Sequence, residues 1–392
     1  MSPHVVIYTD DPDKGGVAQY NHRISLALAA AGFRITLVQT ASTAAMVNTR
    51  AAAGIAHRWI SYDTGKDFVR TITDPADAEA AFEALRPDLV LFSDCCPVSN
   101  IAAKQAAMRR RIPFVTVVNF VAPYLAQRFA SCLPVVARQY AAARGVVAVS
   151  SENLELLVKF FGLPPGKGRV IFYGVPPVFF SPRSEDNRHE LRTRLGIAPG
   201  TMVSLTTARL SAVKLHLLQI GAMEYLKRQV ANPRVVCVWV GDGELRPTLE
   251  AEIARRGLQQ NFILGGLHQD VAPWYDLADV FTLTSESEGM PISIMEAMAK
   301  GLPVVATAVS GVPEELGREG VLLPDPVKDP GAAGLQLAET WMAWSRKPGL
   351  REGVGRRCRV RAAAMFREET MLQNTRAFLE AALTPPDVSL SA

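Results

Sequence analysis

The sequence has little cysteine and little net charge, and it lacks long apolar runs. Five cysteines occur in 392 residues, an odd number without a Cys-x-x-Cys pair, and the six histidines show no metal-site spacing. This pattern excludes a disulfide framework and gives no support for a zinc site. A net charge of +4 does not indicate nucleic-acid binding. No uncharged run reaches the roughly 18 residues of a membrane span, and the first residues lack a signal-peptide pattern. We therefore expect a cytoplasmic protein.

What the sequence does contain is a regular alternation of helical stretches with short runs rich in valine, isoleucine and leucine. The first half has five such runs, at residues 4–9, 34–40, 88–93, 113–119 and 145–150. Helices are expected between them, for example at 17–32 and 75–85. Buried parallel strands have this composition, and strand–helix–strand repetition is typical of an α/β layer fold.

A second series of the same kind begins near residue 201. Its runs lie at 201–210, 234–243, 261–266, 279–285, 302–308 and 320–324. The segment 174–200 is proline-rich and then charged, which is typical of a linker. The sequence therefore predicts two doubly wound α/β domains, the first over 1–173 and the second, beginning with this linker, over 174–365. The last segment, 366–392, contains a helix that could return to the first domain.

The stretch from Ser285 to Leu316 holds two glutamates, Glu288 and Glu296, eight residues apart. Glu288 follows a predicted strand and precedes a predicted helix at 291–301, and ligands bind at such strand ends in open α/β sheets. The start of a helix also suits a phosphate group. Because carboxylates accept hydrogen bonds from sugar hydroxyls, the pair suits a ligand with a sugar on each side of a diphosphate. A capping acid plus an ordinary surface glutamate is the alternative.

This stretch closely resembles the Glu-x7-Glu signature of family 4 retaining glycosyltransferases, which have the GT-B architecture. That architecture consists of two Rossmann-like, doubly wound domains facing a central cleft. The visible departure is Ser310, which stands where a glycine is common. The resemblance implies that Glu296 binds the ribose hydroxyls of a nucleotide sugar and that Glu288 contacts the transferred sugar. It also implies that a backbone segment holds the distal phosphate and the sugar: Gly289, Met290, Pro291 and Ile292.

Two upstream segments resemble other parts of the same family. One carries an arginine and a lysine five residues apart, Arg209 and Lys214, just after a predicted strand. A diphosphate leaving group gains negative charge as the glycosidic bond breaks, and two cations would stabilise it. With Glu288 they form the predicted catalytic set, although solvated surface charges are the alternative. In the other segment the backbone is expected to hold the base: Gly265, Gly266 and Leu267.

The first domain is expected to contribute one glycine loop. Gly16 lies between the first strand and the first helix, where glycine allows a ligand to approach closely, and the resemblance places it against the donor diphosphate or the acceptor. A dinucleotide-binding Gly-x-Gly-x-x-Gly pattern is absent. Asp11 and Asp13 form an Asp-x-Asp string, which holds a metal ion in other transferases. Solvated loop acids are the favoured interpretation, so we predict no metal site and no cofactor beyond the nucleotide sugar.

The acceptor side of the predicted site is less well marked. Many relatives have a histidine after the fifth strand, whereas this chain has Asn119, which cannot carry a proton at neutral pH. Asp94 follows another predicted strand in the same domain. We take Asp94 and Asn119 as candidate acceptor-binding residues, with buried turn residues as the equal alternative. Where relatives often read Ile-Pro-Asn-Gly-Val, this chain reads Ile-Phe-Tyr-Gly-Val, so Gly174 and Val175 match the family pattern and the asparagine does not.

Two segments raise the question of membrane contact. Segment 346–367 carries eight basic residues and one acid. A solvated helix pair is the favoured interpretation, and contact with an anionic membrane surface or acceptor is the alternative. Segment 122–144 mixes apolar residues with arginines at helical spacing. It suits core packing and an acceptor groove as well as docking to a membrane.

Together these features predict a glycosyltransferase. By resemblance, it moves a hexosyl group from a nucleotide sugar, UDP- or GDP-linked, to a hydroxyl of a saccharide or lipid-linked saccharide, with retention of configuration. Because the residues show no internal nucleophile, same-face attack is favoured. A non-catalytic nucleotide-sugar-binding protein and a nucleotide-sugar 2-epimerase of the same architecture are the alternatives.

Overall fold

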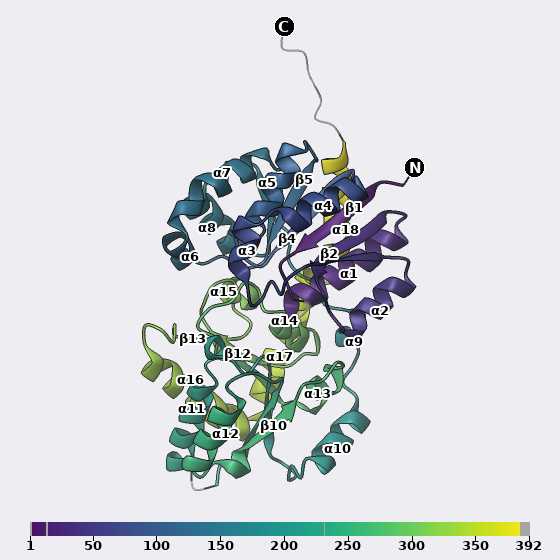
Figure 1. The fold of residues 1–392 in the computed structure, drawn as a ribbon. Coiled ribbons are helices and arrows are strands. Elements are labelled where there is room, and N and C mark those ends of the chain that lie inside the picture. Colours follow the sequence, from purple (N-terminus) through teal and green to yellow (C-terminus); the bar gives the residue numbers. More distant parts are fainter. Residues whose placement is uncertain (1, 13–14, 231, 385–392) are drawn as a thin grey trace. The chain divides into compact units, whose positions relative to one another are not determined.

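The computed structural model describes residues 2–12, 15–230 and 232–384. The chain divides into two compact units, which we call unit 1 (Met1–Tyr173 with Glu369–Ala392) and unit 2 (Gly174–Glu368). Each unit is built around one parallel β-sheet with helices packed against it (Figure 1). The predicted fold class, two doubly wound α/β units, is confirmed.

Unit 1 has a seven-stranded sheet in the order β3-β2-β1-β4-β5-β6-β7, with every pairing parallel. Its strands are β1 (His4–Thr9), β2 (Arg34–Thr40), β3 (Ala56–Ile60), β4 (Leu89–Asp94), β5 (Phe114–Val118), β6 (Val146–Ala148) and β7 (Gly168–Val170). The central strands β1, β4 and β5 are buried along their whole length. Their apolar runs were therefore visible in the sequence.

Helices of unit 1 fill the connections between these strands. They are α1 (Gly16–Ala30), α2 (Ala45–Ala52), α3 (Phe68–Thr73), α4 (Ala76–Leu85), α5 (Ile101–Arg109), α6 (Pro123–Arg128), α7 (Leu133–Ala142) and α8 (Ser151–Phe161), with a 3-10 turn at Ala130–Cys132. Segment 122–144 thus forms α6, the 3-10 turn and α7. Val136 and Tyr140 of α7 are buried in the core of unit 1.

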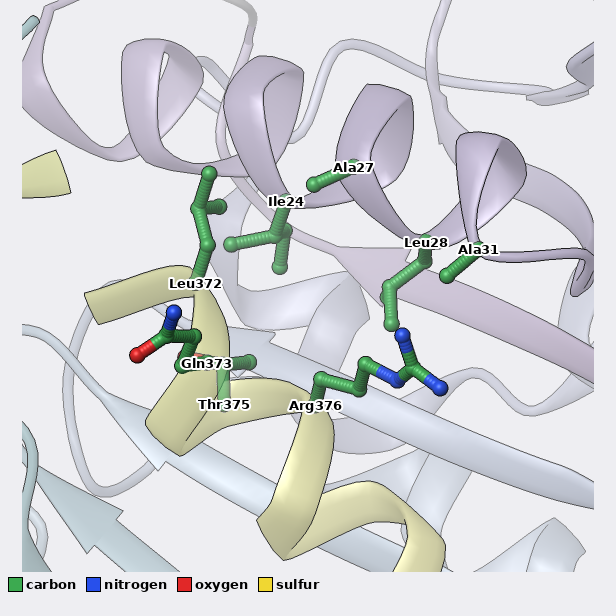
Figure 2. A pocket seen from close by; sticks show the side chains of 8 residues that line it. All are labelled: Ile24, Ala27, Leu28, Ala31, Leu372, Gln373, Thr375 and Arg376. Carbon is green, nitrogen blue, oxygen red and sulfur yellow. The ribbon is translucent and has the colours of Figure 1, made fainter. Parts of the chain in front are cut away.

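The last helix, α18 (Glu368–Leu383), packs within unit 1 although it is distant in sequence (yellow in Figure 1). Phe378 is so close to Gly145 that a Cβ there would lie 2.7 Å from its ring. Between α1 and α18 lies a groove with an apolar floor from α1, and Figure 2 shows the facing side chains. They are Ile24, Ala27, Leu28 and Ala31 from α1 and Leu372, Gln373, Thr375 and Arg376 from α18.

Unit 2 has a six-stranded parallel sheet in the order β10-β9-β8-β11-β12-β13. Its strands are β8 (Met202–Thr207), β9 (Val235–Val240), β10 (Phe262–Gly266), β11 (Val280–Leu283), β12 (Val304–Thr307) and β13 (Val321–Leu323). Its helices are α9 (Pro177–Phe180), α10 (Glu185–Arg194), α11 (His216–Gln229), α12 (Arg246–Arg255), α13 (Ala272–Leu277), α14 (Ile292–Ala299), α15 (Val312–Leu316), α16 (Pro330–Arg346) and α17 (Pro348–Met365). All six strands lie within the runs predicted from the sequence.

The segment predicted as a linker is folded. It forms α9 and α10, and arginines of α10 are bonded to the end of α13 and to Asp279, which directly precedes β11. Arg188 donates to the carbonyl of Leu277 (2.7 Å) and pairs with the buried Asp279 (2.8 Å), and Arg192 also contacts Asp279. Because these bonds satisfy backbone carbonyls and a buried carboxylate, this charged segment is part of unit 2.

At the start of unit 2 the backbone of Gly174 and Val175 runs parallel to residues 366–368, which lie at the junction of α17 and α18. The Val175 amide donates to the Phe366 carbonyl (2.9 Å), and the Glu368 amide donates to the Val175 carbonyl (3.2 Å). A Cβ on Gly174 would lie 2.6 Å from the carbonyl oxygen of Arg367. Only glycine fits such a close approach of two backbones.

The basic segment 346–367 begins at Arg346, the last residue of α16, and otherwise consists mainly of α17, so it contains one whole helix and not the expected pair. Several of its arginines are bonded inside unit 2. Arg359 donates to the carbonyls of Ala299 and Phe180, and Arg361 donates to the carbonyls of Glu314 and Glu315. Among the described residues, no helix combines the length and the apolar character that crossing a membrane requires.

Candidate functional site

Three loops of unit 2 meet at the carboxyl ends of neighbouring strands. Strands β8, β11 and β12 are adjacent in the sheet, so the loops that follow them, 208–215, 284–291 and 308–311, begin side by side. The Glu286 amide donates to the carbonyl of Val213 (2.9 Å), and the Thr307 hydroxyl donates to the carbonyl of Ser285 (2.6 Å). We call these three loops the β8–β11–β12 loop cluster. Its backbone is fixed by hydrogen bonds from both sides.

Glu288 lies in the middle of this cluster and is bound by a cation. The Lys214 Nζ is 2.5 Å from Glu288 Oε1, and the Ser285 hydroxyl donates to the same oxygen. The Lys214 side chain is 20% exposed, and Glu288 is 9% exposed. In such a partly buried setting charge-assisted hydrogen bonds are stronger than at a free surface. The structure therefore brings the predicted Lys214 and Glu288 together.

Glu296 lies on α14 and is held by a tyrosine. The Tyr275 hydroxyl donates to Glu296 Oε2 (2.7 Å) and is 2.6 Å from the Thr207 hydroxyl at the end of β8. Tyr275 is fully buried between Phe179 and Phe281. Burial raises the pKa of the Tyr275 phenol well above its usual value, and the charge of Glu296 adds to this. The phenol therefore keeps its proton and remains a hydrogen-bond donor.

Sequence reasoning missed Tyr275. The local pattern, Trp-Tyr-Asp-Leu on α13, is typical of core packing, and nothing in it shows which residue will receive the hydroxyl. A buried phenol usually has a hydrogen-bond partner, but only the fold identifies Glu296 as the partner of Tyr275. The next residue, Asp276, forms a buried ion pair with Lys300 at the end of α14 (2.9 Å). Together these contacts fix α14 against α13.

The first turn of α14 adds backbone donors to the cluster. Pro291 precedes the helix, and in the described chain no side chain caps its first turn. The first N–H groups of a helix lack intrahelical partners and carry the positive end of its dipole. Gly289, Met290, Pro291 and Ile292 form this entry, and Met290 and Pro291 are buried. An anion placed here would meet N–H groups and the Lys214 ammonium.

Arg209 lies in the first of the three loops and is exposed. A tight Gly-Asp-Gly turn after β9 packs under this loop: a Cβ on Gly241 would lie 2.0 Å from the Ala208 carbonyl oxygen, and one on Gly243 would lie 2.4 Å from that of Leu210. Asp242, between these glycines, accepts a hydrogen bond from the Gly243 amide (2.8 Å). It acts as a turn residue.

The segment expected to hold the base lies at the end of β10. The Gly266 carbonyl accepts a hydrogen bond from the Gly241 amide (2.8 Å), which joins this segment to the Gly-Asp-Gly turn. Gly266 has a φ of +78°, and Leu267 is 80% exposed. His268 bonds the Gly265 carbonyl through Nε2 (3.0 Å). Gly265, Gly266 and Leu267 therefore present backbone and one apolar side chain at this strand end.

The candidate acceptor residues lie in unit 1 and are buried. Asp94 is paired with the buried Lys104 and accepts a hydrogen bond from the Asn100 side chain (2.8 Å). Burial raises the pKa of Asp94 to about 7, although Lys104 opposes the shift. The Asn119 amide donates to the Asp94 carbonyl (2.8 Å) and accepts a hydrogen bond from the Tyr173 hydroxyl. An acceptor-binding role for Asp94 and Asn119 stays a prediction.

Asp10 of unit 1, which sequence reasoning did not single out, is also buried. Its carboxylate accepts hydrogen bonds from the Cys95 amide (2.9 Å) and the Ser99 hydroxyl (2.6 Å).

Gly16 is the first residue of α1, after Gly15, whose φ of 84° and ψ of −153° are essentially restricted to glycine. Asp13, the second acid of the Asp-x-Asp string, lies outside the described residues.

Comparison with known proteins gives matches along both units. The family model described as Glycosyl transferases group 1 matches residues 202–339, and the model described as Glycosyltransferase Family 4 matches residues 14–179. The UDP-Gal:alpha-D-GlcNAc-diphosphoundecaprenol alpha-1,3-galactosyltransferase of Escherichia coli is 31% identical over 168 residues, 42% of this chain and 43% of that protein. A D-inositol 3-phosphate glycosyltransferase of Kribbella flavida is 30% identical over 245 residues, 60% of this chain and 55% of that protein. The chain spans about half the length of the curated relatives it matches.

Solved structures resemble the chain along nearly its whole length. The crystal structure of HepE from Anabaena in complex with UDP has a TM-score of 0.79 and 20% sequence identity, covering 97% of this chain and 100% of that chain. The chain therefore has the fold of GT-B glycosyltransferases. In sequence, unit 2 is similar to the group 1 glycosyltransferases, and unit 1 is similar to those of family 4.

Proposed function

We propose that the protein is a retaining glycosyltransferase, which transfers a hexosyl group from a nucleotide sugar to a hydroxyl of a saccharide or lipid-linked saccharide. The observation that carries this proposal is the β8–β11–β12 loop cluster. There Lys214 lies 2.5 Å from Glu288, and Glu296, on the helix that follows Glu288, accepts a hydrogen bond from Tyr275 of α13. Two placed carboxylates, a cation and a helix start match the parts of a sugar–diphosphate–nucleoside. The similarity to glycosyltransferases supports the same function.

Each residue then has a distinct role. Glu296 binds the ribose hydroxyls, and Glu288 contacts the transferred hexose. The N–H groups from Gly289 to Ile292 hold the distal phosphate, while Lys214 and Arg209 neutralise the charge that develops on the leaving diphosphate. The acceptor hydroxyl attacks from the face that the diphosphate leaves, and the diphosphate oxygen takes its proton. With two cations on the leaving group, no metal ion is required.

The two units divide the substrates between them. Unit 2 binds the donor through the loop cluster and through the backbone of Gly265, Gly266 and Leu267 around the base. Unit 1 binds the acceptor, with Asp94 and Asn119 as the candidate residues, and contributes Gly16 to the donor diphosphate or the acceptor. HepE was crystallised with UDP and with UDP-glucose, so we take a uridine diphosphate sugar as the first donor to test.

A donor screen tests the proposal. Purified protein is mixed in turn with UDP-, GDP- and ADP-sugars, and ligand binding is detected as a rise in Tm. Donors that bind are then incubated with saccharide and lipid-linked acceptors, and product and anomeric configuration are read by mass spectrometry and NMR. Transfer with retention supports the proposal. Binding without turnover would identify a non-catalytic nucleotide-sugar-binding protein, and an epimeric nucleotide sugar would identify a 2-epimerase.

A further inference from the structure

Ser310 has a backbone conformation that a serine adopts at a cost. It lies in the turn after β12, closed by a hydrogen bond from the Val312 amide to the Val309 carbonyl (3.1 Å). Its φ is +47°, in the left-handed region that favours glycine. Positive-φ turns of this kind normally carry glycine, asparagine or aspartate at their first central position. The turn alone therefore does not explain a serine.

The Ser310 side chain is hydrogen-bonded to the backbone of Glu288, the proposed catalytic residue. The Glu288 amide donates to Ser310 Oγ at 3.1 Å. Ser310 is half-buried, and the neighbouring Thr307 hydroxyl binds the same loop at the Ser285 carbonyl (2.6 Å). The end of β12 and the loop that follows it are thus each joined to the Glu288 loop by one hydrogen bond.

Glu288 is consequently held by three loops at once. Lys214, from the loop after β8, and Ser285, from its own loop, both bind the carboxylate. Ser310, from the loop after β12, binds the backbone amide. The contacts from Lys214 and Ser285 hold the Glu288 side chain but leave its backbone free to move. The contact from Ser310 holds the backbone itself.

We propose that Ser310 is a positioning residue, which fixes the backbone of Glu288 and thereby aims its carboxylate at the transferred sugar. The inference rests on the proposed glycosyltransferase function. A glycine would fit the turn without strain but would have no hydroxyl to accept the Glu288 amide. The hydroxyl gives the Glu288 loop a contact that a glycine at this position could not supply.

Three variants separate this role from a purely structural one. Ser310→Gly removes both the hydroxyl and the strained Cβ, Ser310→Ala removes only the hydroxyl, and Ser310→Thr keeps the hydroxyl but adds a methyl group. For transfer from the donor selected by the screen, we expect kcat to fall by about tenfold or more in the glycine and alanine variants, because small misplacements of reacting groups are costly. The donor KM stays close to that of the wild type, since a contact felt only in the transition state lowers kcat alone.

The three variants should rank differently in thermal stability than in kcat. The glycine variant keeps a Tm at least equal to that of the wild type because its backbone strain is relieved, and the alanine variant has a lower Tm. The threonine variant is the least stable of the three because a β-branched residue is poorly tolerated at positive φ, yet its kcat lies above those of the glycine and alanine variants.

The possible results separate this inference from the proposed function. If the wild type transfers sugar and the glycine variant matches its kcat, or if kcat follows Tm across the three variants, the role of Ser310 is overturned and the function stands. If the wild type neither binds nor transfers any nucleotide sugar, both are overturned.

Discussion

Glu288 is the residue on which the proposed chemistry depends most. Replacing it with alanine removes the carboxylate that Lys214 and Ser285 hold. We expect kcat for transfer to fall by about 10²–10³-fold, as when one group that stabilises the transition state is lost, while UDP affinity changes little because the diphosphate contacts remain. Enzyme assays and calorimetric titration with UDP measure the two effects. Unchanged transfer in Glu288→Ala would contradict the assignment.

Tyr275 is expected to act on nucleotide binding through Glu296. Tyr275→Phe keeps the buried ring but removes the donor to Glu296 (2.7 Å). We expect UDP to bind about tenfold more weakly, equivalent to ~1.4 kcal/mol, because a hydrogen bond to a charged group is lost, and Glu296→Ala to weaken UDP binding further. Tyr140→Phe is the matched control: it removes a hydroxyl that is buried in unit 1 and has no hydrogen-bond partner among the described residues. Equal effects from the two phenylalanine variants would exclude this role.

Glu315 gives a pH-dependent prediction. Its carboxyl is fully buried, and burial raises its pKa well above the usual 4.5; the charge of Glu288 adds to the shift, while the Met295 backbone and Arg361 oppose it. The folded state therefore binds this proton more tightly than the unfolded chain. The resulting stability is complete below pH 4.5 and is lost as pH rises through the folded pKa.

Glu315→Gln cannot titrate, so the wild-type Tm should fall relative to that of the variant as the pH rises above 4.5. Thermal unfolding of both proteins at several pH values measures this difference. Glu314→Gln, one position earlier and partly exposed, serves as the control. A Tm difference between wild type and Glu315→Gln that does not depend on pH would show that Glu315 titrates normally.

The sequence could predict the charged members of the site but not the residues that hold them. Glu288, Glu296 and Lys214 stand at fixed distances from predicted strand and helix ends, so their approximate places follow from the α/β pattern. Tyr275 and Ser310 act through a hydroxyl whose partner is distant in sequence, by 21 residues for Tyr275 and 22 for Ser310. Neither partner could be inferred before the strands were ordered.

At the scale of elements, the strands that sequence analysis found are those with continuous apolar runs. The six strands of unit 2 and the central strands of unit 1 are of this kind. Strand β3 was missed because its residues, Ala-His-Arg-Trp-Ile, are mostly exposed or half-buried. Strand β7 was missed because its residues, Gly-Arg-Val, form no apolar run and none of them is fully buried. Both are edge strands of their sheet, where only part of the surface is buried.

The neighbouring backbone segments at Gly174 give a prediction about an element boundary. Gly174→Ala places a Cβ 2.6 Å from the Arg367 carbonyl oxygen, and we expect it to lower the free energy of unfolding by about 1–3 kcal/mol, as overpacking does. Gly221→Ala is the matched control because its Cβ, on α11, would meet no atom within 4 Å. The control should raise stability by about 1 kcal/mol through helix propensity. Chemical denaturation measures both, and equal stability of Gly174→Ala and wild type would contradict the close approach.

At the scale of the whole molecule, the two units have similar sheets but different chemistry at their strand ends. In unit 2 the loop cluster carries Glu288, Lys214 and exposed Arg209, together with a helix start that no side chain of the described residues caps. In unit 1 the corresponding acids, Asp10 and Asp94, are buried and bonded to their own unit. This contrast supports our assignment of donor binding to unit 2.

Hydrogen exchange of the full chain, with and without saturating UDP, tests the donor-site assignment most directly. Binding should slow exchange of backbone amides in residues 208–215 and 284–292 of unit 2, because the diphosphate would engage N–H groups at the start of α14 and order the loop of Arg209 and Lys214. The Glu296→Ala protein should require more UDP for the same protection. Binding of UDP that leaves both segments unprotected would contradict the assignment.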